Sequence, residues 1–184
     1  GEGEDADSGL DDFGDGLLPR LVERGRVPAH RLTGYWRDLG QPHHYLNAHL
    51  ELLDGDTGLF DRDWPLRSQL PQLQPARVVD GAGASDVLLS PGCEVAGTVR
   101  RSVLGPGVVV EAGAVVEESV VFADTVVRAG ARVRRAVVDS GCELLDGADV
   151  GGPDVDLADP DAIPMVGRDS RVSTRLSAGA RLLP

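Results

Sequence analysis

The second half of the chain places an aliphatic residue at every sixth position, and this spacing restricts the fold more than any other feature of the sequence. Three windows of 17 residues, 102–118, 119–135 and 136–152, can be laid in register. Within each window the aliphatic residues fall six and six apart, and five residues lead to the next window. The three columns are Leu104, Val121 and Val138; Val110, Val127 and Leu144; and Val116, Val133 and Val150. Strands repeat every two residues and helices every 3.6, so neither explains this spacing.

A six-residue spacing is typical of a triangular coil in which each side is a short strand that ends at a tight corner. One aliphatic side chain per side then points inward and stacks on its equivalent in the next coil, about 4.8 Å away. Two further units extend the pattern, and they carry Leu89, Val95 and Val99, and Val166, Val172 and Ala178. We therefore predict a mainly β fold with a parallel β-helix over residues 87–184, and a β-sandwich of short strands is the alternative. Resemblance to hexapeptide-repeat proteins implies a left-handed helix, because periodicity alone does not fix the hand.

The same register predicts contacts between charged side chains. The pairs 100–101, 117–118 and 134–135 are Arg-Arg, Glu-Glu and Arg-Arg, and they lie 17 residues apart. Glu111 likewise falls opposite Arg128. We expect these side chains to stack within ion-pair distance at one corner, where exposed pairs contribute about 0–1 kcal/mol each.

The two cysteines fall in nearly one column, with Val108 and Thr125 between Cys93 and Cys142. Three coils separate them, so their Cα atoms should lie roughly 14 Å apart, beyond disulfide reach. We expect buried packing thiols in a reducing compartment. A reactive cysteine is the alternative.

Charge excludes one class of partner. The chain has 30 acidic residues against 18 arginines and no lysine, which gives a net charge of −12, so we expect no nucleic-acid binding. No apolar run is long enough for a transmembrane helix, and no secretory leader opens the chain. We therefore expect a cytoplasmic protein without membrane partners. Because residue 1 is Gly, we also expect a fragment or a processed piece.

The first half has a different organisation. Residues 1–10 are acidic and are expected to be disordered, and residues 71–86 are rich in Pro, Gly and Ala and are expected to be a linker. Between them the patterns predict a helix at 15–25, a strand at 27–32 and a helix from 42 to 53. All four histidines precede the repeat, so a β-helix over 87–184 has no histidine base or zinc site of its own. The spacing of His43, His44 and His49 indicates solvated helix surface rather than a metal pair.

Asp38 is the candidate for chemistry. It lies in GYWRDLG (34–40), which predicts an aromatic strand followed by a helix start, and so places a carboxylate at the rim of a sheet. Mg²⁺ needs one or two such carboxylates together with substrate phosphates. A capping role or a salt bridge to Arg37 is the alternative.

Four segments, in order, carry a family resemblance. They are DFGDGLLPRLVERGRV, GYWRDLGQPHHYLNAHLELL, FDRDWPLRS and PARVV, and the hexapeptide coils follow them. Together they resemble the C-terminal portion of bacterial ADP-glucose pyrophosphorylase (glucose-1-phosphate adenylyltransferase) over residues 11–184. The resemblance implies that 11–70 are the α/β C-terminal end of a nucleotidyltransferase domain and that 87–184 are a left-handed β-helix. It also implies that the whole enzyme converts ATP and glucose 1-phosphate to ADP-glucose and pyrophosphate for glycogen synthesis.

The resemblance implies roles for particular residues. Asp38 matches a catalytic, Mg²⁺-binding aspartate, and Trp36 and Arg37 match its neighbours at the sugar-phosphate end of the pocket. Arg168 matches an arginine of an anionic-effector site, with plain surface arginine as the alternative, and Ser140 replaces a second effector arginine found in some members. A tetramer is implied as well.

Departures from the family leave other readings open. The Gly-rich nucleotide loop, the first metal aspartate and the sugar-phosphate lysine all belong upstream, so we expect this chain alone to be inactive. Gln41 replaces a threonine that would cap the following helix better. The alternatives are a non-catalytic β-helix scaffold or regulatory subunit, and a nucleotidyltransferase that makes GDP- or UDP-sugars.

Overall fold

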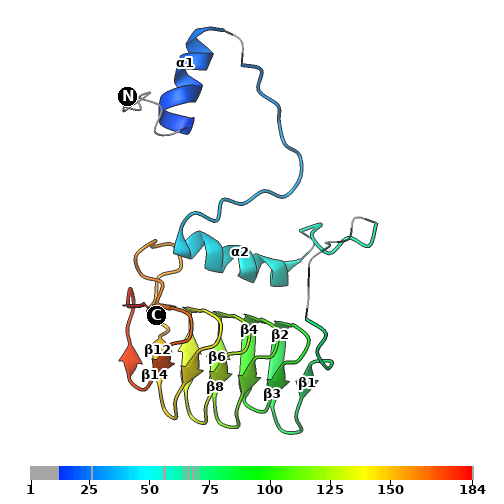
Figure 1. Cartoon of the computed structure of the whole chain (residues 1–184), viewed down its shortest axis with the longest axis vertical. Coiled ribbons are helices and arrows are strands. Elements are labelled where there is room, and N and C mark those ends of the chain that lie inside the picture. The colour runs from blue at the N-terminus through cyan, green and yellow to red at the C-terminus, as the bar shows by residue number, and fades with distance from the viewer. Residues whose placement is uncertain are drawn as a thin grey trace, which may run out of the picture. The chain divides into compact units, whose positions relative to one another are not determined.

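The computed structural model describes residues 13–25, 27–55, 57–63, 65, 67, 69 and 71–183 (Figure 1). The predicted acidic segment 1–10 lies outside these residues. The chain divides into two compact units, Gly1–Gly34 and Tyr35–Pro184, of which the second contains the repeat.

The described residues of the first unit contain one short helical segment. A π-helical turn, η1 (Phe13–Leu17), leads into α1 (Leu18–Glu23), and the chain turns at Gly25. This confirms the helix expected at 15–25. The strand expected at 27–32 is wrong, because these residues are exposed and pair with no strand in the described part of the chain. A β-favouring sequence needs a neighbouring strand to bond, and none is present there.

The second unit is a parallel β-helix with one helix, α2 (Pro42–Asp54), along its side (Figure 1). Its strands within the described residues are β1 (Arg77–Val78), β2 (Gly83–Leu89), β3 (Glu94–Val95), β4 (Thr98–Leu104), β5 (Val109–Val110), β6 (Val115–Glu117), β7 (Val120–Val121), β8 (Val126–Val127), β9 (Arg132–Arg134), β10 (Val137–Val138), β11 (Glu143–Leu144), β12 (Asp149–Gly151), β13 (Met165–Val166), β14 (Arg171–Val172), β15 (Arg175–Leu176) and β16 (Arg181–Leu182). All of the strand pairs are parallel. The order β1-β3-β5-β8-β11-β14 forms one side, and a second sheet forms the other two sides. The predicted fold class is confirmed.

Register and burial confirm the three predicted columns. Val99, Val116 and Val133 are direct partners in neighbouring strands, and so are Leu104 and Val121. The nine residues of the three windows are completely buried. At about 25 cal/mol per Å² of apolar surface removed from water, this stacked interior is the main source of the fold's stability.

The repeat starts earlier and ends differently from the prediction. β1 and most of β2 lie within residues 71–86, which we expected to be a linker, so the first coil begins before residue 87. At the other end, the inward residue opposite Val150 is Leu176 and not the predicted Ala178, which is exposed. The last coil is shorter on that side, so a strict six-residue spacing from Val172 places the inward position two residues too late.

An insertion separates the fourth unit of the repeat, residues 136–152, from the fifth. Val138 pairs with Val166, which is 28 residues later instead of 17. The additional residues form the loop between β12 and β13, which carries four aspartates, Asp154, Asp156, Asp159 and Asp161. The later strands keep the register, because each coil contacts only its neighbours.

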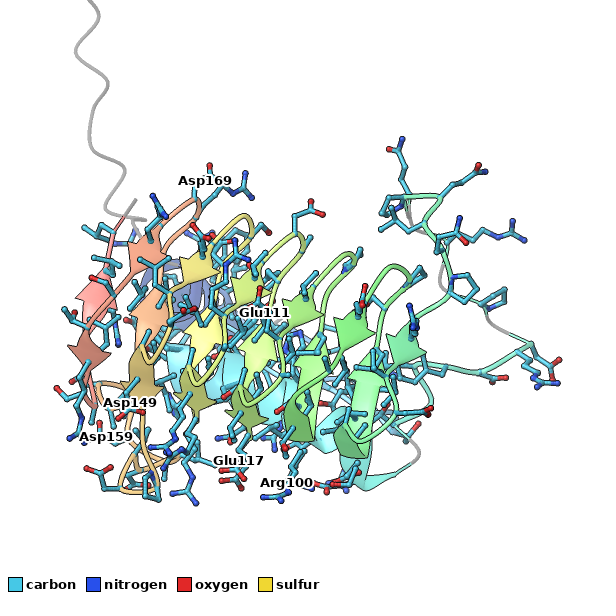
Figure 2. The ribbon with its side chains drawn as sticks, turned by 90° about the horizontal axis from the view of Figure 1, so that it is seen from below. Arg100, Glu111, Glu117, Asp149, Asp159 and Asp169 are labelled. Atoms are coloured by element: carbon cyan, nitrogen blue, oxygen red, sulfur yellow. The ribbon has the colours of Figure 1, made fainter. Side chains whose placement is uncertain are left out.

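The predicted charged ladder forms at one corner of the stack, except that Arg101 pairs outside it. Arg100 donates to Glu117 at 2.8 Å, and the Nε atom of Arg134 lies 4.0 Å from the same carboxylate. Arg135 donates to Glu118 at 2.7 Å. Figure 2 shows Arg100 and Glu117 side by side on one edge of the coils. The alignment of the windows is therefore confirmed at the level of individual side chains.

The predicted pair of Glu111 and Arg128 also forms, at 2.7 Å, and Arg128 contacts Glu143 at 2.6 Å as well. The hydrogen bond from Arg128, with help from the charge of Arg171, holds the pKa of Glu143 below its usual value. These groups are substantially exposed, so they fix register more than they stabilise the fold.

The corner beside Gly151 is the most crowded of the glycine positions. Its φ of +74° lies in the left-handed region, and a Cβ atom there would sit 1.9 Å from the carbonyl oxygen of Arg134. Gly147 has nearly the same φ, +73°, yet nothing lies within 4 Å of its Cβ position. Substitutions at the two glycines can therefore distinguish the cost of backbone strain, which both share, from the cost of steric overlap, which only Gly151 has.

We expect Gly151→Ala to lower the free energy of unfolding by about 3 kcal/mol, since the backbone must move to relieve the overlap. Gly147→Ala should cost only about 1 kcal/mol, the strain of a left-handed alanine. Chemical denaturation of both variants measures the difference. Equal losses would mean that the corner at Gly151 relaxes freely.

Candidate functional site

The candidate site lies where α2 meets the outside of the β-helix. The sequence favours a helix here because Pro42 occupies its first turn and Leu46, Leu50 and Leu53 fall on one face. Leu46 and Leu50 are buried against outward-facing residues of successive coils. These residues are Val103, Val120, Val137 and Met165, together with Val155 and Ile163 of the insertion. α2 is therefore held to the β-helix by an apolar face that continues across four coils.

Polar contacts hold α2 against the β-helix near its start and at its end. Arg101, which we expected in the charged ladder, turns instead to Asp54 at the end of α2, with an N–O distance of 2.7 Å, and also contacts Asp86 at 3.4 Å. The hydrogen bond from Arg101 lowers the pKa of Asp54. Nearer the start of α2, the Asn47 side chain donates to the carbonyl oxygen of Leu157 in the insertion, at 2.8 Å. The helix thus has little freedom to slide along the coils.

The segment before α2, residues 35–40, carries the predicted site residues, and we call it the aromatic segment. None of its residues belongs to a strand, so the aromatic strand expected before Asp38 is wrong. The segment instead lies alongside α2 and is bound to Glu51. The Tyr35 hydroxyl donates to Glu51 Oε2 at 3.0 Å. Arg37 donates to the same oxygen through Nε at 2.8 Å and to Glu51 Oε1 through Nη2. Arg37 therefore pairs with Glu51 and makes no salt bridge to Asp38.

Asp38 lies just before the helix start. Its Oδ1 atom accepts the N–H of Gly40 at 3.0 Å, and its Oδ2 atom lies 3.7 Å from Nδ1 of His44. Its side chain is 59% exposed, so a ligand can reach it. Gln41, at the N-cap position, makes no side-chain capping hydrogen bond, as the sequence predicted.

A magnesium ion fits this arrangement in part. Mg²⁺ is commonly bound by one or two carboxylates and by substrate phosphates, and Asp38 offers one reachable carboxylate. Among the described residues, no group of three or more His, Cys, Asp and Glu side chains could hold a metal ion. Asp38 would therefore act as one ligand among several that come from elsewhere.

A hollow of about 360 Å³ opens beside the aromatic segment. It is lined by Trp36 and Leu39 on one side and by His49 and Leu52 of α2 on the other. Trp36 is 70% exposed, so its ring is available for contact with a ligand or another part of a protein. Arg37 also lines the hollow, although Glu51 holds its guanidinium group.

Arg168 lies on the coil after the insertion. The pairing of Val138 with Val166 places it beside Ser140, and Asp169 donates its N–H to the Ser140 carbonyl oxygen at 3.0 Å. The sequence linked these two positions by resemblance, and the structure brings them together on neighbouring coils. Arg168 is exposed.

The remaining candidate groups have structural surroundings. Cys93 and Cys142 are both free and buried, and burial raises the pKa of each thiol. They occupy one column with Val108 and Thr125, as predicted. A raised pKa disfavours the reactive thiolate, so packing thiols are the better interpretation. The described helices include none that is long and apolar enough to cross a membrane.

The fold and the repeat define the class of the protein, a β-helix of the hexapeptide type. Residues 74–160 match the family model described as "GlmU-like, C-terminal hexapeptide", which covers most of the coils.

Comparison with individual curated proteins identifies a narrower group of relatives. The chain is 42% identical over 128 residues to "Glucose-1-phosphate adenylyltransferase" of Streptomyces coelicolor, which covers 62% of this chain and 32% of the relative. It is 39% identical over 158 residues to the protein of that name from Nitrosospira multiformis, covering 76% of this chain and 37% of the relative. The chain thus spans about a third of the length of these relatives. The predicted similarity to the C-terminal part of glucose-1-phosphate adenylyltransferases is confirmed.

Sequence reasoning missed two residues of this site, Glu51 and Arg101. Glu51 was one acid on an amphipathic helix, and its spacing of 14 residues from Arg37 has no regular meaning. Arg101 was assigned to the ladder because the coil register was visible in the sequence, whereas the position of α2 was not. The path of a helix across several coils leaves no periodic signal in the sequence, even where the helix itself is predictable.

Proposed function

We propose that this chain is the C-terminal part of a glucose-1-phosphate adenylyltransferase, which joins ATP and glucose 1-phosphate to give ADP-glucose and pyrophosphate. The observation that carries the proposal is the similarity to several curated enzymes with that one name, at up to 42% identity. The α2 junction supports it, because it keeps the YWRD motif together with the β-helix.

In this reaction a phosphate oxygen of glucose 1-phosphate attacks the α-phosphorus of ATP, and pyrophosphate leaves. Catalysis of this kind depends on positioning and on stabilising charge at the phosphates. Bound Mg²⁺ would supply charge stabilisation at those phosphates. Asp38 would hold it with one carboxylate, and Trp36 and Arg37 would flank the sugar-phosphate end of the pocket.

Two further parts of the proposal concern regulation and assembly. Arg168, exposed and beside Ser140, would contribute to a site for an anionic effector. The β-helix would help to assemble a homotetramer, and the enzyme would act in the cytoplasm. Support for these parts comes from the family resemblance and from the exposure of Arg168.

The test is a pyrophosphorolysis assay on the full-length gene product with Mg²⁺. Parallel reactions contain ADP-glucose, GDP-mannose or UDP-glucose together with pyrophosphate, and ATP, GTP or UTP formation is followed. We expect turnover of ADP-glucose. Turnover of only another sugar nucleotide would support a different nucleotidyltransferase, and no turnover of any would support a non-catalytic scaffold.

A further inference from the structure

The Glu51 carboxylate accepts three hydrogen bonds from the aromatic segment. One carboxylate accepts the Tyr35 hydroxyl at 3.0 Å and the Nε–H of Arg37 at 2.8 Å, and it accepts a third hydrogen bond from Arg37 Nη2. A paired guanidinium and carboxylate of this kind form one of the stronger side-chain contacts. Arg37 is the main reason why the pKa of Glu51 lies below its usual value.

The position of Glu51 along α2 matters. It lies nine residues after Pro42, which corresponds to about 14 Å of helix. The aromatic segment runs directly into the helix start at Gln41, where Asp38 Oδ2 lies 3.7 Å from His44 Nδ1 without a hydrogen bond, and it is hydrogen-bonded to α2 again at Glu51. The backbone that carries Asp38 is therefore held at two separated points on one rigid helix.

α2 is itself fixed to the β-helix. Leu46 and Leu50 are buried, and Asp54, three residues after Glu51, pairs with Arg101 of β4. A continuous set of contacts thus runs from the β-helix through α2 and Glu51 to the segment that carries Asp38.

We propose that Glu51 is a positioning residue for nucleotidyl transfer, which holds Arg37 and Tyr35 so that Asp38 is presented in a fixed orientation. This inference rests on the proposed function. Glu51 touches neither the substrate nor the metal. It acts through Arg37, whose guanidinium group it engages with two hydrogen bonds. The role of Arg37 thereby includes holding the aromatic segment in place, in addition to lining the hollow.

The test uses the full-length gene product with Glu51→Ala, Glu51→Asp and Arg37→Ala, and the double variant Glu51→Ala/Arg37→Ala. Glu94→Gln is the matched control, an exposed glutamate on β3 away from α2. Hydrogen exchange followed by mass spectrometry reports on a peptide that covers residues 35–40. Kinetics in the pyrophosphorolysis direction give kcat and the Mg²⁺ concentration for half-maximal rate.

We expect Glu51→Ala to speed amide exchange in residues 35–40 and to lower kcat by roughly 10- to 100-fold, since small misplacements of a reacting group have effects of that size. The half-maximal Mg²⁺ concentration should rise, while Glu51→Asp should restore part of kcat. The double variant should be no worse than the more impaired single variant, because both residues act through one contact. Glu94→Gln should match the wild type.

Three outcomes would overturn parts of these proposals. If the wild type is active and Glu51→Ala has wild-type kcat and Mg²⁺ dependence, the positioning role is wrong and the proposed function stands. If the wild type turns over no sugar nucleotide, the proposed function fails and its positioning residue with it, whatever the exchange data show. Additive losses in the double variant would also contradict action through Arg37.

Discussion

Replacing Val116 with aspartate is expected to prevent the β-helix from folding. The Val116 side chain is completely buried and stacks between Val99 and Val133. A carboxylate there would have no partner and no water, and burying such a group costs several kcal/mol. Domains are stable by only about 5–15 kcal/mol, so one such change can remove most of the stability. Circular dichroism during thermal unfolding measures the effect.

The neighbouring residue supplies the control. Val115 is half-buried on the outer surface, and its partners in adjacent strands are Thr98 and Arg132. Val115→Asp places a carboxylate beside an arginine in contact with water, so its effect should stay within about 1 kcal/mol. A cooperative transition of Val116→Asp at the wild-type temperature would show that this column does not face the interior.

Asp38→Asn in the full-length enzyme should lower kcat by about 100-fold or more. The change removes the negative charge that would hold Mg²⁺, and metal-ion stabilisation of transition-state charge contributes several kcal/mol. Asparagine has nearly the same shape and retains an oxygen that can accept the Gly40 N–H, which Asp38 now accepts at 3.0 Å. The fold should therefore persist, and steady-state rates across a range of Mg²⁺ concentrations report the loss.

Asp146→Asn is the comparison for charge alone, because Asp146 is exposed in a corner of the β-helix. It should leave the rate unchanged. Equal rates for Asp38→Asn and the wild type at saturating Mg²⁺ would refute the metal-binding role of Asp38, and unfolding of the Asn variant would instead show that the fold needs the charge of Asp38.

The sequence was sufficient to predict the coils because their physics is local and periodic. Each inward residue needs only an equivalent 17 positions away, so Val110, Val127 and Leu144 can be aligned without knowledge of the rest of the fold. The same holds for Arg100 and Glu117. α2 was predictable for a related reason, since Pro42 and the leucine spacing act within one helix.

The parts that were missed depend on non-periodic, long-range packing. The inward position opposite Val150 is occupied by Leu176 and not by the predicted Ala178, because the last coil is shorter on that side. A fixed six-residue spacing cannot detect a shortened side. The position of the Asp38 segment against α2 rests on Glu51, whose partners are 14 and 16 residues away in sequence. Outward valines such as Val120 carry no sequence signal for α2, whose cover over them appears in the structure.

The placement of α2 has a consequence for how the molecule comes apart. A stack of coils in which each touches only its neighbours tends to fray from its ends, one coil at a time. Here a helix near the start of the second unit packs on Val103, Val120, Val137 and Met165, which belong to four successive coils. Opening any of these coils also exposes Leu46 or Leu50 to water. We therefore expect α2 to couple the four coils, so that they unfold together in one cooperative step instead of one after another.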